Sequence, residues 1–204
     1  FDGSYDNYTY QIANLRKEDR NAFYQTHEET QALIDQYTSE TDALFNEVLM
    51  LAESNLSQTE LSVFIAEVMK NATDSAIGFQ NGGGTRNSID QDEAIDLALL
   101  YQVWPFDNIV KTVYLTGSEI KDMMGRYIYQ TDITNFDDDT LYKVATNDYI
   151  FDKPDNPFIY GEDIVNTYLN MRELAFQEIK LQSYLFDFFH TSNDIQTTPA
   201  SLTD

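Results

Sequence analysis

Three consecutive glycines beside an arginine form the first stretch of this sequence that could carry chemistry. Gly82, Gly83 and Gly84 lie between Asn81 and Arg86, and the chain has only eight glycines in all. Glycine tolerates a positive φ and lets a ligand approach the backbone closely, while an arginine guanidinium binds oxygen acceptors through a planar fork. The stretch therefore predicts a shelf for an anion or a flat ring, with a tight structural turn as the alternative interpretation. It is not a P-loop, because the Gly-Lys-Ser/Thr ending is absent.

The residue types needed for hydrolysis at a metal centre are scarce. The chain has two histidines, His27 and His190, far apart in the sequence and without an Asp-X-His pattern. A dinuclear phosphoesterase centre needs several His and Asp ligands, so we expect this chain to bind no metal and to hydrolyse no phosphate ester by itself. The acidic run 136–140 lacks the spacing of a calcium-binding loop, and the absence of cysteine excludes thiol catalysis and disulfides.

Composition and charge describe a folded, strongly acidic chain. Its 204 residues are 42% hydrophobic and 14% aromatic, and 35 acidic against 12 basic residues give a formal net charge of -23. So negative a surface repels phosphate backbones, which disfavours nucleic acid as a partner. No apolar run is long enough to predict a transmembrane segment. The sequence begins without methionine or a secretion signal, so we expect a mature or trimmed segment with a further domain upstream.

Hydrophobic spacing predicts helices interleaved with strands. The apolar spacing predicts a helix from Asn21 to about Ser54, with a short strand at the end of this stretch, within 47–53. The next helix, at 57–73, begins with a Ser57–Glu60 capping box. Further elements are expected in this order: a strand at 75–80, a helix or strand at 96–106, a strand at 108–117, a helix at 118–128 capped by Ser118 and limited by Gly125, a strand within 137–151, and a final helix at 162–189.

These elements predict one layered α/β (α+β) domain in which helices flank a mixed sheet. We expect the domain to span 21–190, preceded by a linker or loosely docked arm at 1–20 and followed by a flexible polar tail at 191–204.

Four ordered motifs carry a resemblance to a known family. They are Asn-Gly-Gly-Gly-X-Arg at 81–86, Trp-Pro-Phe-Asp-Asn at 104–108, "LTGSEIKDMM" at 115–124 and "LYKVATNDYI" at 141–150. From about Phe45 to Lys180 the chain resembles the C-terminal domain of the 5'-nucleotidase family, which includes UDP-sugar hydrolases and 2',3'-cyclic phosphodiesterases. The resemblance implies an extracytoplasmic protein (periplasmic, secreted or cell-surface) in which a separate N-terminal metallophosphoesterase domain holds two divalent metal ions.

The resemblance also implies a nucleotide- or nucleoside-binding wall. Asn81 would contact the base or ribose, Arg86 would lie near the substrate, and Phe106 would stack on the base. A second aromatic residue after the Asn-Asp motif would cover the other face of the base; Phe158 is the nearest match and Tyr160 the competitor. The expected substrate-binding set is therefore Asn81, Gly82, Gly83, Gly84, Arg86, Phe106, Asn108, Asn147, Asp148 and Phe158. Base stacking on aromatic rings, at about 1–3 kcal/mol per base, supports these roles physically.

Three departures from the family pattern leave a second hypothesis open. No basic residue lies in the stretch 52–60 at the start of the helix at 57–73, prolines at 154 and 157 stand in a loop that is glycine-rich in the family, and the segment between Met124 and Leu141 is short. The alternative is a non-catalytic surface or interaction module that keeps the fold with a degenerate nucleotide site. A complete small enzyme is the weakest hypothesis, because no nucleophile–base pair is visible.

Overall fold

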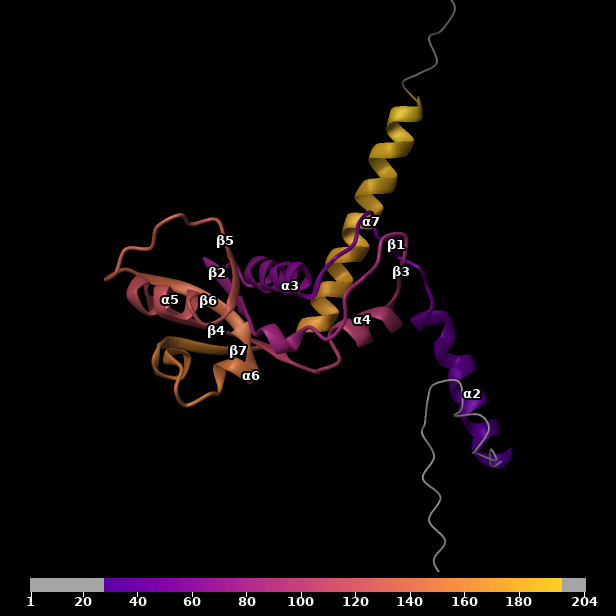
Figure 1. Ribbon diagram of the computed structural model, residues 1–204, viewed down its shortest axis with the longest axis horizontal. Helices are drawn as coiled ribbons and strands as arrows, with labels where there is room; N and C mark the ends of the chain where they lie inside the picture. The colour runs from indigo at the N-terminus through magenta and orange to yellow at the C-terminus, as the bar shows by residue number, and fades with distance from the viewer. Residues whose placement is uncertain (1–27, 196–204) are drawn as a thin grey trace, which may run out of the picture. The chain divides into compact units, whose positions relative to one another are not determined.

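The computed structural model describes residues 28–195 (Figure 1). The arm expected at 1–20, His27 and the last nine residues of the expected tail lie outside the described part. Backbone contacts divide the chain into two units, Phe1–Ala43 and Leu44–Asp204. The described part of the first unit is helix α2 (Glu28–Phe45), which continues two residues into the second. Every other element belongs to the second unit.

Helix α2 ends at Phe45, nine residues before the predicted end. The chain then runs to strand β1 (Met50–Leu51), which pairs antiparallel with β3 (Ala94–Ile95). The backbone N–H of Leu49 also donates to the carbonyl of Ile95 at 2.8 Å. Pairing with a strand distant in sequence therefore outweighs the helical spacing of the apolar residues. The short strand expected within 47–53 is confirmed.

A five-stranded mixed sheet forms the centre of the second unit, with strand order β5-β2-β6-β4-β7. Strands β2 and β6 are parallel neighbours, and the other pairs are antiparallel. The strands are β2 (Ile77–Gln80), β4 (Ile109–Thr116), β5 (Ile128–Thr131), β6 (Leu141–Asn147) and β7 (Glu162–Asn170). The predicted strands at 75–80, 108–117 and within 137–151 are confirmed.

Helices cover both faces of this sheet, so the core has two parts. Helices α3 (Gln58–Ala72), α4 (Leu97–Val103) and α7 (Met171–Ile195) contribute to one cluster of buried side chains, which includes Ala145. Helices α5 (Gly117–Met124) and α6 (Asp148–Phe151) and the 3₁₀ turn η2 (Pro157–Tyr160) contribute to the other, which includes Val144. Successive residues of a strand point to opposite faces, so Val144 and Ala145 mark the two sides. The predicted fold class, a mixed sheet flanked by helices, is confirmed.

Helix α3 begins as its sequence predicts. The Ser57 side chain accepts a hydrogen bond from the Glu60 N–H, and the Glu60 carboxylate accepts one from the Ser57 N–H at 2.8 Å. Two of the backbone donors left open at a helix start are thereby satisfied. Helix α3 lies alongside β2 (Figure 1), where a Cβ at Gly78 would stand 2.0 Å from the Ala66 carbonyl oxygen. The close packing of helix on sheet thus depends on this glycine.

Two predicted helix starts are wrong. Thr116, not Ser118, caps α5, because its side chain accepts from the Glu119 N–H and Glu119 completes a capping box. The final helix begins at Met171 rather than at 162, since the preceding nine residues form the edge strand β7 against β4. Helix α7 continues to Ile195, well into the segment expected as a tail.

Within residues 28–195, no helix is long and apolar enough to cross a membrane.

Candidate functional site

The candidate site lies where two parallel strands end side by side. Strand β2 ends at Gln80 and leads into Asn81, while β6 ends at Asn147 and leads into α6. Because parallel neighbours present their carboxyl ends at the same edge, loops meet there and ligands commonly bind there. The Asn147 Nδ2 donates a hydrogen bond to Asn81 Oδ1 at 3.0 Å. Two predicted site residues, 66 positions apart, are thus in direct contact.

A cleft of about 450 Å³ opens at this edge. It is lined by Asn81, Gly83, Arg86, Phe106, Asn108 and Tyr149. Five of these six were predicted from the sequence, and they come from two loops, while Tyr149 lies in helix α6. Tyr149 was not predicted: it follows the Asn-Asp motif directly, and the residue is 58% exposed. Its position next to that motif was the signal that could have identified it.

Arg86 and Phe106 face one another at the cleft. The Arg86 guanidinium carbon lies 5.4 Å from the centre of the Phe106 ring, and Phe106 is 40% exposed. A cation over an aromatic face is attracted by the ring quadrupole. Among the described residues, no carboxylate lies within ion-pair distance of Arg86. In so acidic a chain a guanidinium without an ion pair is available for a ligand.

A buried hydrogen-bond group fixes the backbone beneath Arg86. Thr85 is 1% exposed, and its hydroxyl accepts from Ser62 Oγ at 2.7 Å and from Trp104 Nε1 at 3.2 Å. The Arg86 N–H donates to the Val103 carbonyl at 2.8 Å. The glycine loop and the Trp-Pro-Phe loop are therefore held together by atoms of the core, and their exposed ends meet at the cleft.

Arg172, at the start of α7, holds the Trp-Pro-Phe loop from the other side. Its Nη1 donates to the Trp104 carbonyl at 2.7 Å, and its Nη2 pairs with the Asp107 carboxylate. The guanidinium also lies 3.6 Å from the centre of the Tyr101 ring. Arg172 was not predicted from the sequence, because an arginine 65 positions after Asp107 carries no local signal of the contact.

The three glycines matter for the room that their missing side chains leave, not for unusual backbone angles. None of the three glycines has a φ in the left-handed region, so the turn does not use glycine's tolerance of a positive φ. They form a 3₁₀ turn, η1 (Gly82–Gly84). A Cβ at Gly84 would lie 2.6 Å from Gln80 Nε2 and 3.1 Å from Asn81 Oδ1, whereas one at Gly82 would meet nothing nearer than 3.7 Å. Gly84 is therefore required for the side-chain amides behind the turn, and Gly83 alone of the three lines the cleft.

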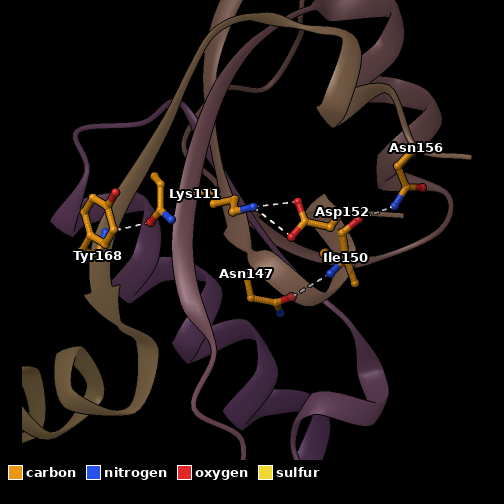
Figure 2. A network of polar contacts seen from close by, with 7 residues as sticks. Lys111, Asn147, Ile150, Asp152, Asn156 and Tyr168 are labelled. Carbon is orange, nitrogen blue, oxygen red and sulfur yellow. Dashed lines mark hydrogen bonds and ion pairs between the residues drawn. The ribbon is translucent and has the colours of Figure 1, made fainter. Parts of the chain in front are cut away.

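Phe158 does not face the cleft, contrary to the prediction. It is fully buried and packs against Phe79, Phe151 and Tyr127. Its loop is fixed because Asn156 Nδ2 donates to the Ile150 carbonyl at 2.6 Å (Figure 2), and Pro157 begins the turn η2 that carries Phe158 inward. The competitor Tyr160 is 75% exposed but lines a different hollow, beside Ser118 and Pro154.

The remaining predicted residues surround the cleft without lining it. Asn147 is fully buried behind Asn81, and Asp148 occupies the first turn of α6 with a buried Oδ1 that has no hydrogen-bond partner in the described structure. Gly82 is exposed and Gly84 is buried. Lys153 lies outside the lining but places its Nζ 4.6 Å from the centre of the Tyr149 ring. Within residues 28–195, no group of three or more His, Asp or Glu residues could hold a metal ion.

Comparisons with known proteins agree on the fold. Residues 36–136 match the family described as "5'-nucleotidase, C-terminal domain". Similar solved structures include a 5'-nucleotidase precursor from Thermus thermophilus (TM-score 0.60, 20% identity, 76% of this chain and 40% of that one). The NAD nucleotidase of Haemophilus influenzae gives a TM-score of 0.57 at 19% identity, over 78% of this chain and 40% of that one.

A third structure broadens the chemistry associated with this fold. SoxB, the sulfate thiohydrolase of Thermus thermophilus, matches with a TM-score of 0.56 at 12% identity, over 80% of this chain and 38% of its own. No curated protein sequence matches the chain significantly. The chain thus spans about 40% of the length of the structures it resembles. From the family match and the shared fold we conclude that this chain carries a 5'-nucleotidase C-terminal domain.

Proposed function

We propose that the chain is the nucleotide-recognition part of a 5'-nucleotidase-type phosphohydrolase. The observation that carries the proposal is the pairing of Arg86 with Phe106 at a cleft that also contains Tyr149 and two asparagines. A volume of about 450 Å³ lies within the usual size of small-molecule sites. Two of the similar structures are named as nucleotidases, one of them an NAD nucleotidase, which agrees with a nucleotide as the ligand.

Each lining residue has a role that its chemistry suits. The base stacks on the exposed rings of Phe106 and Tyr149, at about 1–3 kcal/mol for a stacked base. Arg86 donates to ribose or phosphate oxygens, and the amides of Asn81 and Asn108 donate to or accept from polar atoms of base and ribose. Arg86 and Lys153 place positive charge beside these rings, which locally offsets the repulsion between an anionic ligand and a chain of net charge -23.

The hydrolytic step belongs, in this proposal, to a separate metallophosphoesterase domain. Two divalent ions in that domain would activate water and stabilise the charge that develops on the phosphate. The recognition domain supplies orientation, and closure between the two domains carries the bound nucleotide to the metals. We further propose an extracytoplasmic location, as the family resemblance implies.

A second candidate function rests on the position of Phe158. Its withdrawal into the core leaves Tyr149 as the second ring at the cleft. The fold also occurs in a protein named as a sulfate thiohydrolase, so it does not by itself require a nucleotide. A module that keeps the fold and binds no nucleotide is the competing hypothesis.

Isothermal titration of the full chain with adenosine, AMP and UMP distinguishes the two hypotheses. The proposal predicts saturable binding of at least one of them, weakened about tenfold or more by Phe106→Ala through the loss of stacking. Tyr168→Ala is the matched control, because that tyrosine is 82% exposed and lies on the edge strand β7. Absence of heat with all three ligands, from a chain with a cooperative thermal transition, would favour the non-binding module.

A further inference from the structure

A backbone donor fixes the orientation of the buried Asn147 side chain. The Ile150 N–H donates to Asn147 Oδ1 at 3.0 Å, which caps helix α6 (Figure 2). A backbone N–H can only donate, so the atom that faces it must be the amide oxygen. The usual ambiguity between amide oxygen and nitrogen is therefore removed at this residue, and Asn147 Nδ2 must point the other way.

Both hydrogens of that Nδ2 are used by neighbouring amides. One goes to Gln80 Oε1 at 2.5 Å and the other to Asn81 Oδ1 at 3.0 Å. Each of these partners must present its oxygen, because a nitrogen there would place two donors face to face. Orientation is thus transmitted from Ile150 through Asn147 to Asn81, which lines the cleft.

The buried Gln80 shows how strongly the network imposes this order. Its Nε2 is buried without a hydrogen-bond partner in the described structure, and the residue is fully inaccessible. A buried donor without a partner costs about 1–3 kcal/mol, yet turning the amide over would oppose its nitrogen to Asn147 Nδ2. The missing side chain of Gly84 leaves the space in which Nε2 lies.

Since Asn81 Oδ1 faces Asn147, the side-chain atom of Asn81 without a partner is its Nδ2. No described residue accepts a hydrogen bond from that atom. It lies beside Gly83, where a Cβ would stand 3.9 Å from it. Asn81 and Gly83 both line the cleft, so this amide nitrogen lies close to the glycine that faces the same space.

We infer that Asn147 is a positioning residue that makes the cleft selective for a hydrogen-bond acceptor at Asn81. The group recognised there is a ring nitrogen or carbonyl oxygen of the base, and an amino group at the same place is rejected. The inference rests on the proposed function, since it concerns the same cleft. On this inference, Asn81 donates a hydrogen bond to the ligand rather than accepting one. The identity of Asn81 alone does not decide this, because an unconstrained asparagine can turn its amide to suit either partner.

Adenosine and its 1-deaza, 3-deaza and 7-deaza analogues test the polarity. Each analogue replaces one ring nitrogen by C–H and leaves the shape and the stacking surface almost unchanged. For the unaltered chain we expect one analogue to bind about tenfold more weakly than adenosine, as for a lost hydrogen bond whose donor stays unpaired. Equal affinity for adenosine and all three analogues would overturn the inference while leaving nucleoside binding intact. Failure to bind any of the four, or AMP or UMP, would instead remove the proposed function.

The variant Asn147→Asp tests the role of Asn147 itself. Aspartate keeps an oxygen for the Ile150 N–H and is a good helix cap, but the ionised side chain has no hydrogen to donate. Asn81 then turns its Nδ2 toward the carboxylate and presents Oδ1 to the cleft. We expect the roughly tenfold discrimination among the analogues to disappear.

A fold control accompanies this variant. Slow exchange of the Ile150 amide hydrogen shows that the cap of α6 is retained. If Asn147→Asp does not fold, Asn147→Ser keeps an accepting oxygen and at most one donor hydrogen, and it should weaken the discrimination in the same direction. A folded variant of either kind that discriminates as strongly as the unaltered chain would contradict the inference.

Discussion

Two hollows in the second unit differ in whether their polar groups have hydrogen-bond or ion-pair partners. One, which we term the apolar hollow, has a volume of about 290 Å³ and lies among α3, α7 and the β1–β3 pair. Its lining is mostly core side chains, including Leu61, Ile89 and Ile179. The other is the cleft at the ends of β2 and β6, with a volume of about 450 Å³. Their apolar content alone would favour the first as a ligand site.

The hydrogen bonds point the other way. In the apolar hollow the carboxylate of Glu60 is already used, because it accepts from the Ser57 N–H and hydroxyl. At the cleft, Arg86 has no ion pair and Asn81 Nδ2 no acceptor among the described residues. Polar groups that already bond to the protein indicate a structural role. Polar groups that are held in place without a partner indicate a ligand-binding role. In this protein, polar groups without a hydrogen-bond or ion-pair partner therefore indicate the ligand site better than apolar surface does.

The largest expected effect is a loss of stability, without a loss of ligand affinity, when the apolar hollow is enlarged. Leu61 is 4% exposed, so Leu61→Ala enlarges the hollow and should lower the free energy of unfolding by about 2–5 kcal/mol. Urea denaturation measures the loss, and titration below the transition should give the adenosine affinity of the unaltered chain. A large loss of affinity in the folded variant would make the apolar hollow part of the binding site.

The converse change at the cleft should alter affinity and leave stability unchanged. Arg86→Met keeps an unbranched stem beside Phe106 and removes the charged donors. Hydrogen bonds to a charged group contribute about 1.5–3 kcal/mol, so we expect AMP to bind roughly tenfold or more weakly. The melting temperature should stay close to that of the unaltered chain, because Arg86 has no ion pair among the described residues. Unchanged AMP affinity would mean that Arg86 does not contact the ligand.

A matched pair of glycine substitutions tests the amide network behind the cleft. Gly84→Ala would force Cβ against Gln80 Nε2, 2.6 Å away in the present geometry, and overpacking of this kind costs about 1–3 kcal/mol. Gly82→Ala, whose Cβ would meet nothing nearer than 3.7 Å, should be close to neutral. Thermal unfolding of both variants checks the difference, and equal melting temperatures would refute the assigned role of Gly84.

The smallest effect is a pH dependence at the apolar hollow. Hydrogen bonds from the Ser57 side chain and backbone hold the pKa of the Glu60 carboxyl below its ordinary value of 4.5. With the folded pKa below the unfolded one, the stabilisation is present above about pH 4.5 and is lost as the pH falls through the folded pKa. Glu60→Gln keeps a capping partner but no charge. The difference in melting temperature between the two chains should therefore shrink on acidification; a difference that stays constant from neutral to strongly acidic pH would contradict this.

Local signals were sufficient for much of the fold. The Ser57–Glu60 box and the apolar spacing after it identified helix α3, since a cap and its helix involve neighbouring residues. The β-branched run of β4 identified that strand for a similar reason. Strand β7 was missed because it forms by pairing with β4, which is distant in the sequence, and its own residues continue without a break signal into α7.

The candidate site was predictable only in its local motifs. Asn81, Arg86, Phe106 and Asn108 were found because the glycine run and the Trp-Pro-Phe motif are contiguous in sequence. The second ring was assigned to Phe158, since spacing cannot tell which aromatic residue of a loop packs inward. Burial of Phe158 against Phe79 and Phe151 decides this through the tertiary structure.

The most direct test of the central claim is a two-dimensional NMR titration of the full chain with adenosine. The account predicts saturable shifts of the Asn81 side-chain NH₂ and the Arg86 Nε–H signals, with the backbone amides of Leu61 and Ile89 at the apolar hollow unmoved. Shifts centred on Leu61 and Ile89, with Asn81 and Arg86 unmoved, would contradict it.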